Sequence, residues 1–312
     1  MLIAIGGILV DIVVVPGVGL KPGSDAPGVI DIRPGGVAAN FAFWAAVLGE
    51  DSGVIGAVGR DVLADFALSD LHEVGVRLFT RAHPDLRTGC LVSLVSPSGE
   101  KSFVTQRAAD EKIMPEDITE DLISRTSWLH IGGYALYTDP PFAATQRAIA
   151  LAASYGVPIS LDPCSWHLLR EFGADRFLHI ARCAAVLMPN YDEGRVLTGK
   201  ERPSDIALDL LQYAPLVVVK LGRDGCVIAE GEEARTCPTR PADAVVDSTG
   251  AGDAFDAAFV VEYRRSRDPQ RAACLANALA REVVQTVGAR PAPPVARGWL
   301  ARLGLQLTDK EH

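Results

Sequence analysis

Apolar positions in the first third of the chain come in short runs separated by glycine, proline and polar residues. Runs of this length, rich in valine and isoleucine, predict strands. Two of them are joined by a turn sequence at 96–99, which predicts a hairpin. With two earlier runs the hairpin forms a candidate small, separate sheet, whose strands are expected at 8–15, 29–32, 88–95 and 101–107.

The rest of the chain has a different texture, because strand-like runs alternate with stretches that suit helices. Such alternation predicts a parallel sheet with helices on both faces, and ligands of these sheets bind at the carboxyl ends of the strands. The expected strands are 2–5, 53–59, 128–131, 157–161, 185–188 and 216–220. The expected helices are 37–49, 61–73, 142–154, 166–180, 204–212 and 271–287.

The segment 245–261 joins two valines, which predict the end of a buried strand, to a largely apolar helix. Between them lies the turn Gly250-Ala251-Gly252. The free N–H groups and the positive dipole end of the helix point back into this turn, so it can hold an anion. Asp253 follows in the first helical turn, where its carboxylate faces the anion site. An anion site with a base beside it suggests a group-transfer reaction. Ordinary helix capping is the alternative interpretation.

A second glycine pair, Gly35-Gly36, opens an alanine-rich helix that ends at Gly49. Asn40 is the polar residue on this helix, and its amide can donate to and accept from a hydroxyl. Asp11 interrupts an apolar strand, where a buried carboxylate needs a partner or a polar ligand. A position facing solvent is the alternative for Asp11.

Polar residues also follow three of the predicted strands, at the edge where ligands bind. In chain order they are Asp162, Asn190, Glu193 and Lys220, the last followed by Gly222 and Gly225. Carboxylates beside an anion site favour magnesium, which proteins typically hold through one or two such groups, water and substrate phosphates. An exposed acid at a helix start is the alternative for Glu193.

Composition limits the partners. The 312 residues carry a formal net charge of -9, which argues against sequence-independent nucleic-acid binding because a polyanion would be repelled. The longest uncharged run, 34–49, is too short and too polar to span a bilayer, so no membrane role is expected. Six cysteines without CxxC spacing are expected to be reduced, in a cytoplasmic protein.

Two distant signatures resemble those of the ribokinase-like, or PfkB-type, family of carbohydrate and nucleoside kinases. The segment from Asp247 to Asp253 resembles the C-terminal signature, and Gly35-Gly36 with Asn40 resembles the N-terminal one. Three further segments are similar to the magnesium-associated motif, the nucleotide loop and the adenine-side helix of the family; they are, in that order, Asn190 with Glu193, Lys220 with Gly222 and Gly225, and Asn277.

The resemblance implies one α/β domain over residues 1–312, a three-layer αβα sandwich with a mostly parallel central sheet. A small β-sheet lid would be formed discontinuously by about 8–33 and 86–108. The implied reaction transfers the γ-phosphate of ATP to a hydroxyl, usually a primary alcohol, of a small sugar-like molecule. Asp253 would be the base, and the N–H groups of 250–252 would stabilise charge on the transferred group.

The resemblance also implies roles for the other candidates. Sugar hydroxyls would contact Asp11, Gly35, Gly36 and Asn40. Mg²⁺ would be organised, largely through water, by Asn190 and Glu193. The nucleotide would lie along Asn190, Lys220, Gly222, Gly225 and Asn277. In members that use a monovalent cation such as K⁺, it lies beside Asp247 and Thr249. Lids of this family often meet across a dimer, so a homodimer through the lid is expected.

Departures from the family patterns leave the substrate open. Val37 stands where the ribokinase pattern has lysine, which weakens ribose. Of an Asp-x-Asn-x-Arg pattern found in fructokinase-like and keto-deoxysugar kinases, only Asp162 is retained. Arg107 resembles the arginine of some sugar and sugar-acid kinases and can pair a carboxylate bidentately, or else it ends a hairpin in solvent. Sugars, sugar acids and adenosine-type nucleosides all stay candidates, as does a non-catalytic sensor.

Overall fold

The centre of the molecule is a nine-stranded sheet in the order β13-β12-β11-β10-β9-β8-β1-β4-β5. The structure is a computed structural model and describes residues 1–95 and 101–303. Strands from β11 to β5 are parallel, and the antiparallel hairpin β12-β13 extends one edge. The strands are β1 (Leu2–Ile5), β4 (Ser52–Gly59), β5 (Arg77–His83), β8 (Trp128–Gly132), β9 (Ile159–Asp162), β10 (Val186–Leu187), β11 (Leu216–Lys220), β12 (Cys226–Glu230) and β13 (Glu233–Cys237).

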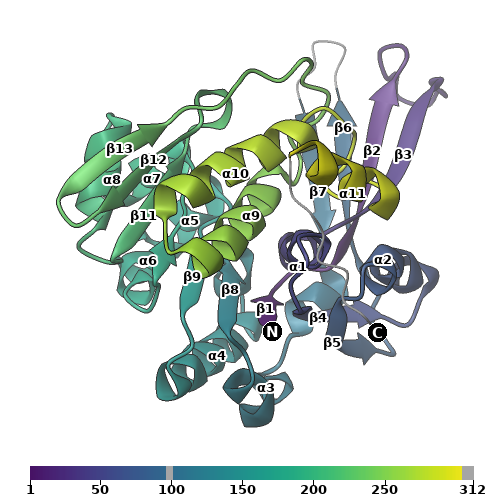
Figure 1. The fold of residues 1–312 in the computed structure, drawn as a ribbon. Helices are drawn as coiled ribbons and strands as arrows, with labels where there is room; N and C mark the ends of the chain where they lie inside the picture. The colour runs from purple at the N-terminus through teal and green to yellow at the C-terminus, as the bar shows by residue number, and fades with distance from the viewer. Residues whose placement is uncertain (96–100, 304–312) are drawn as a thin grey trace.

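Helices cover both faces of this sheet, and each face buries its own apolar cluster (Figure 1). One layer contains α1 (Val37–Val47), α2 (Val62–Glu73), α9 (Ala251–Ser266), α10 (Pro269–Val283) and α11 (Pro293–Arg302). The other contains α3 (Glu120–Ser124), α4 (Pro141–Tyr155), α5 (Trp166–Phe172), α6 (Ala174–Ala181), α7 (Tyr191–Thr198) and α8 (Pro203–Leu210). The predicted three-layer αβα sandwich is therefore confirmed.

A second, four-stranded sheet projects from the body at the upper right of Figure 1. Its order is β3-β2-β6-β7, and its strands are β2 (Leu9–Pro16), β3 (Gly28–Gly35), β6 (Gly89–Val95) and β7 (Lys101–Gln106). The register places Asp11 opposite Arg33 and Ile12 opposite Ile32. Because side chains alternate along a strand, these two pairs lie on opposite faces of the sheet. The predicted small sheet is confirmed, and the turn expected at 96–99 lies outside the described residues.

Three local expectations differ from the structure. The helix expected at 166–180 is divided at Gly173, whose φ of 98° is incompatible with a continuous helix. The strands at the two edges of the central sheet, β5 and the hairpin β12-β13, were not expected. The strand end expected at Val245 and Val246 is wrong, because both valines are exposed and lie outside any strand. The chain there is instead tied to the end of α10, since the N–H of Val246 donates to the carbonyl of Val284 at 2.8 Å.

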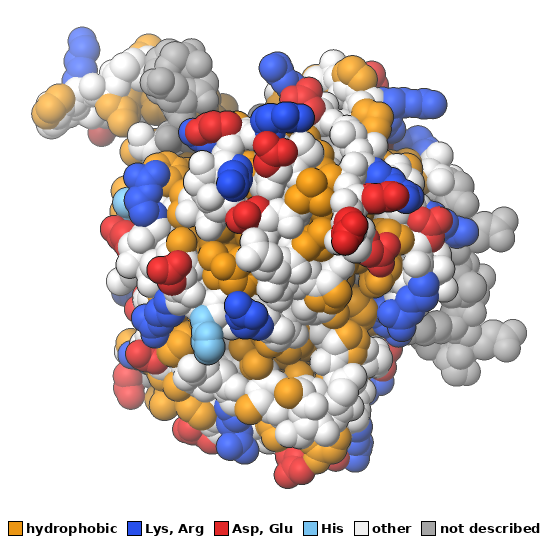
Figure 2. Space-filling view, turned by 90° about the vertical axis from the view of Figure 1, so that its left-hand side faces the viewer, with side chains coloured by type: hydrophobic (Ala, Val, Ile, Leu, Met, Phe, Trp, Pro, Cys, Tyr) orange, Lys and Arg blue, Asp and Glu red, His pale blue; other side chains and the backbone are white. Residues whose placement is uncertain are grey.

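The surface seen in Figure 2, the side of α8 and β13, intersperses acidic and basic side chains with small apolar areas. Mixed charge of this kind is typical of a solvated face rather than of a surface that binds a polyanion. Within the ranges 1–95 and 101–303, no helix combines the length and the apolar character needed to cross a membrane.

Candidate active site

Residues from distant parts of the sequence meet at the carboxyl ends of the central strands. The bond that joins them runs from Asn40 Nδ2 on α1 to Asp253 Oδ2 in the first turn of α9, at 2.7 Å. The ring of Phe41 stacks on the buried ring of His130 from β8, with centroids 3.9 Å apart, and so holds α1 against the sheet. The two predicted signatures are therefore in direct contact.

The turn before α9 has the backbone shape expected of an anion site. Gly250 is the N-cap residue, with φ 74°, and a Cβ there would lie 2.1 Å from the Cβ of Ala289. No other residue fits this turn without moving the chain. The amide of Ala251 donates to the carbonyl of Ser248 at 3.3 Å. The next N–H groups, from Gly252 onward, begin a helix of 16 residues and face its free end.

Asp253 has the protonation behaviour of a group that can accept a proton near neutral pH. Burial raises its pKa to about 7, the hydrogen bond from Asn40 opposes that rise, and the neighbouring carboxylate of Asp162 adds to it. A general base works best when its pKa lies near the operating pH. Its position and its pKa therefore both suit Asp253 to that role.

A buried ion group lies next to the turn. Lys220 Nζ, at the end of β11, donates to Asp162 Oδ2 at 2.8 Å and to Asp256 Oδ1 at 3.0 Å. The same Nζ is 3.8 Å from the place a Cβ would take on Gly252. Burial alone would lower the pKa of Lys220, but the two carboxylates hold it well above its ordinary value. Lys220 is thus a fixed positive charge under the anion turn.

Asp11 lies on the same face of the small sheet as the position of Gly35. Its side chain is buried, and a Cβ on Gly35 would lie 2.3 Å from its Oδ2, so the carboxylate rests directly on the glycine backbone. Burial raises the pKa of Asp11 to about 6, against the pull of the Arg290 guanidinium, and the carboxylate of Asp247 adds to the rise. The alternative that Asp11 faces solvent is wrong.

Asn190 and Glu193 form a reciprocal capping box at the start of α7. The N–H of Asn190 donates to Glu193 Oε2 at 2.8 Å, its Nδ2 donates to Oε1 at 2.7 Å, and the N–H of Glu193 donates to Asn190 Oδ1 at 3.0 Å. Glu193 is only 1% exposed, so the alternative of an exposed first-turn acid is wrong. Burial raises its pKa to about 8.

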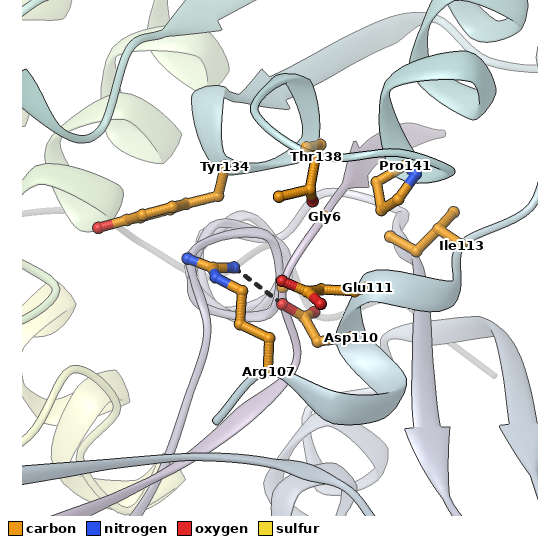
Figure 3. Close-up of a pocket in the computed structure, with 10 residues that line it drawn as sticks. Gly6, Arg107, Asp110, Glu111, Ile113, Tyr134, Thr138 and Pro141 are labelled. Atoms are coloured by element: carbon orange, nitrogen blue, oxygen red, sulfur yellow. Dashed lines mark hydrogen bonds and ion pairs between the residues drawn. The ribbon is translucent and has the colours of Figure 1, made fainter. Parts of the chain in front are cut away.

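Arg107 lies at the base of the small sheet and points inward (Figure 3). Its Nη1 donates to the buried carboxylate of Asp110 at 3.0 Å, and its guanidinium lies 4.3 Å from the ring centre of Tyr134. The alternative of a solvent-facing hairpin end is therefore wrong. These three side chains, with Gly6 and Gly7, line a small pocket beside the site.

Comparison with known proteins identifies the family. A model described as pfkB family carbohydrate kinase matches residues 2–296. The chain belongs to this family. It is 31% identical to a fructokinase of Klebsiella pneumoniae over 275 residues, 85% of this chain and 87% of that one. An adenosine kinase structure from Sinorhizobium meliloti superimposes with a TM-score of 0.86 at 24% identity, covering 97% and 98% of the two chains.

A second solved structure resembles this carbohydrate kinase along almost its whole length. It is an E. coli protein described as a ribokinase II, in complex with ATP and Mg²⁺. The TM-score is 0.83 at 25% identity, with 96% of this chain and 99% of that one covered. The ribokinase-like fold inferred from the two signatures is confirmed.

In this carbohydrate kinase the loop before the anion turn is held by Asp247. Its Oδ1 accepts from the N–H and the hydroxyl of Thr249, at 3.0 and 2.7 Å, and its Oδ2 accepts from the N–H of Gly288 at 3.0 Å. Both carboxylate oxygens thus link the turn to the chain that follows α10. Asp247 is therefore not a helix cap, because Gly250 is the N-cap residue of α9 and no side chain caps that helix.

The remaining predicted nucleotide residues form a second group, at the edge hairpin of the kinase. Gly222 and Gly225 bound the short turn between β11 and β12. A Cβ on Gly225 would lie 2.2 Å from the carbonyl oxygen of Cys237 at the end of β13. Asn277 on α10 is buried and donates to that same carbonyl at 3.0 Å. The loop, the hairpin and the helix therefore contact one another around Cys237.

Two charged residues of the site were not expected from the sequence. Asp256 interrupts the apolar run of α9, and a lone carboxylate in such a run is itself a sign of a buried partner. Arg290 is fully enclosed, with its Nε 3.1 Å from Asp70 Oδ2 on α2, and its charge acts on Asp11. The carboxylates that act on its charge, Asp70, Asp11 and Asp253, come from three separate segments, so no spacing in the sequence indicates them.

The ion group generates a stability prediction. Lys220→Met should lower the free energy of unfolding by about 3–5 kcal/mol, because it leaves two buried carboxylates without their cation. Asp256→Asn should cost less, about 1–2 kcal/mol, since the pair between Lys220 and Asp162 survives. Urea denaturation at pH 7 measures both. Equal losses, or a larger one for Asp256→Asn, would contradict the assignment of Lys220 as the shared cation.

Proposed function

We propose that this carbohydrate kinase transfers the γ-phosphate of ATP to a primary alcohol of a sugar or sugar acid, with Asp253 as the base. The observation that carries the proposal is the carboxylate of Asp253. It is half-buried, has a pKa raised to about 7, accepts a hydrogen bond from Asn40, and stands in the first turn after the anion site. Few ordinary helix-start acids combine these properties.

The proposed chemistry follows from the arrangement of the donors. The hydrogen bond from Asn40 orients the carboxylate of Asp253, which takes the proton of the attacking hydroxyl. The backbone N–H groups of Gly250 and Gly252 stabilise the charge on the transferred phosphoryl group, and that of Ala251 would do so only on leaving the carbonyl of Ser248. The fixed charge of Lys220 adds to the positive potential at the turn. Because these groups are held in place before substrate arrives, little reorganisation is needed during transfer.

We propose that the nucleotide runs from the anion turn past Asn190 and Lys220 to Gly222, Gly225 and Asn277. Support comes from the E. coli relative, which is described in complex with ATP and Mg²⁺. Since Lys220 is held by two carboxylates, its effect on phosphates would be through its charge rather than through direct contact.

A divalent cation fits the charge of this edge. The buried carboxylate of Glu193 and the half-buried carboxylate of Asp253 both have raised pKa values, a sign that negative charge there lacks compensation. Mg²⁺ would supply charge neutralisation for the nucleotide phosphates. Asn190 and Glu193 already bond to each other, so they would hold the ion largely through water. No group of three acidic, histidine or cysteine ligands suited to a metal occurs among the described residues.

A role for K⁺ beside Asp247 and Thr249 stays a prediction. Hydrogen bonds from Thr249 and Gly288 already engage both carboxylate oxygens of Asp247, so the donors give the ion no particular support. We therefore assign no step to a monovalent cation. Activity compared in potassium and sodium salts at equal ionic strength tests the prediction.

For the sugar we propose contacts with Asp11, Gly35, Gly36 and Asn40. Asp162 was predicted among them, but its contact with Lys220 favours a positioning role. The guanidinium of Arg107 already donates to Asp110, so it would have to bind a substrate carboxylate and Asp110 at the same time. Neutral sugars are therefore the first candidates, sugar acids the second. Nucleosides are the third candidates, because an adenosine kinase has a similar fold.

The experiment that tests this function is a coupled ADP-release assay with ATP and Mg²⁺ against sugars, sugar acids and nucleosides. We expect turnover of a sugar, and the ratio of kcat/KM values then ranks the classes. Preference for a nucleoside would replace the sugar proposal. Ligand binding without phosphoryl transfer to any of these alcohols would favour a sensor.

Asp253→Asn tests the base. We expect kcat to fall at least about 100-fold, the usual contribution of a positioned general base, with ATP affinity changed only a few-fold. Steady-state kinetics and ATP titration measure the two effects. The matched control is Asp65→Asn, another first-turn acid, exposed on α2, which should leave kcat unchanged. A near-normal kcat for Asp253→Asn would remove the base assignment.

The pKa of Asp253 sets a pH dependence. Because the base must be ionised, kcat/KM should fall as the pH drops below about 7. Asn40→Ala removes a hydrogen bond that lowers the pKa of Asp253, so the acidic limb of the profile should move to higher pH. An unchanged limb in this variant, measured from pH 5 to 9 by the same assay, would contradict the coupling.

We propose that the small sheet acts as the lid of the site and as the contact of a homodimer. Its face opposite Asp11 carries apolar side chains in cross-strand register, with Ile30 66% and Val104 65% exposed. Exposed apolar sheet faces of this kind usually mark an interface. A second copy of the chain suits it because the same face can pair with itself about a two-fold axis.

Ile30→Glu should convert the dimer to a monomer in sedimentation or light-scattering measurements, since a charge would be buried at the contact. Val29→Glu is the matched control, because Val29 is equally exposed, at 64%, on the same strand but on the opposite face. A protein that is monomeric without substitution, or equal disruption by both variants, would contradict this face as the interface.

The cytoplasm is the proposed compartment. The described cysteines are all free, as expected in a reducing environment, and the proposed phosphate donor is ATP.

A further inference from the structure

Three cysteines that are distant in sequence gather at the edge hairpin. Cys226 and Cys237 face each other in the register of β12 and β13. Cys237 Sγ lies 3.4 Å from Cys274 Sγ on α10. Asn277, one turn further along α10, directs its Nδ2 to the carbonyl of Cys237 and to the Cys237 sulfur at 3.5 Å. A disulfide needs about 2.05 Å, so the two sulfurs of the close pair are about 1.4 Å from bonding distance.

The members of the close pair differ in exposure. Cys237 is buried, whereas Cys274 belongs to the exposed surface of α10. An oxidant can therefore reach Cys274, while Cys237 is held beside it in fixed contact. This is the arrangement of a peroxide-accessible thiol with a resolving thiol.

Hydrogen bonds to Cys237 favour its thiolate. Contacts with the thiol of Cys226, and then with Cys274 and Asn277, lower the pKa of Cys237 to about 6, against the opposing effect of burial. A thiolate is the nucleophilic form of cysteine. Burial and the contact with Cys237 raise the pKa of Cys274, so Cys237 has the greater thiolate character of the two sulfurs.

We propose that Cys237 and Cys274 are a redox modification site, at which a peroxide forms a disulfide between β13 and α10. In the first step the Cys274 sulfur is oxidised to a sulfenic acid as hydrogen peroxide is reduced to water. The thiolate of Cys237 then attacks that sulfur, the S–S bond forms, and hydroxide leaves. Two thiol sulfurs lose two electrons in total, and a thiol reductant restores them by exchange.

The consequence rests on the proposed nucleotide role of Gly225 and Asn277. Both contact the carbonyl of Cys237, one through its backbone and the other by a hydrogen bond. Closing the sulfurs to bonding distance draws Cys237 towards α10 and so moves this carbonyl. The disulfide should therefore weaken ATP binding, raising the KM for ATP at least about 5-fold, the low end of typical coupling between sites.

The test treats the full-length kinase with a small excess of hydrogen peroxide and maps the products by mass spectrometry. Trypsin separates the three cysteines, because arginines lie between Cys226 and Cys237 and between Cys237 and Cys274. We expect a linked peptide pair containing Cys237 and Cys274 that disappears with dithiothreitol. Cys274→Ser should abolish it, whereas Cys183→Ser, a matched control on a different helix end, should not. A bond between Cys226 and Cys237, or no bond at all, would overturn the proposal.

The second readout is the KM for ATP before oxidation, after oxidation and after reduction. A reversible rise in the wild type that is absent in Cys274→Ser supports the effect on nucleotide binding. A complete disulfide with unchanged KM would overturn that effect. Peptide mapping needs no activity, so a protein that forms the bond but phosphorylates nothing would count against the proposed function and not against the modification site.

Discussion

The hydrogen bond between Asn40 and Asp253 is the contact on which the site depends. It connects α1, which follows the glycine pair of the small sheet, to the first turn of α9, 213 residues later in the chain. Because Asn40 can only donate through Nδ2, the contact fixes both the position of the carboxylate and the face that it turns to a ligand. Stacking of Phe41 on His130 keeps α1 in place, so the packing of the core and the chemistry of the site are joined at one helix.

Around this contact the fold gathers negative charge. Burial raises the pKa of Asp11, Asp253 and Glu193, and each carboxylate makes its neighbours harder to ionise. Lys220 offsets part of this charge and is itself held by two carboxylates, Asp162 and Asp256. An arrangement with this much buried charge is poor for stability alone. We interpret it as the electrostatic environment that keeps the pKa of the proposed base, Asp253, near 7 and that binds a nucleotide together with its cation.

The sequence predicted the inner strands of the sheet, most of its helices and the segments that meet at Asn40 and Asp253, because glycines and carboxylates at the ends of apolar runs carry strong local signals. It failed where the outcome depends on distant neighbours. Val245 and Val246 have strand-forming side chains, yet the end of α10 fixes them as an exposed loop. The partner of Asp256, Lys220, can be identified only once the fold brings β11 and α9 together. The inward direction of Arg107 likewise depends on Asp110 and Tyr134, which the fold alone brings to it.

The central claim is that a substrate hydroxyl meets Asp253 at the anion turn. A crystal structure with the preferred sugar and a non-hydrolysable ATP analogue tests it most directly. The account predicts density for the sugar between Asp11, Asn40 and Asp253, with a hydroxyl oxygen about 2.6–3.2 Å from the Asp253 carboxylate and facing the terminal phosphate. A sugar bound elsewhere, or a hydroxyl out of reach of Asp253 while the phosphate lies at the turn, would contradict it.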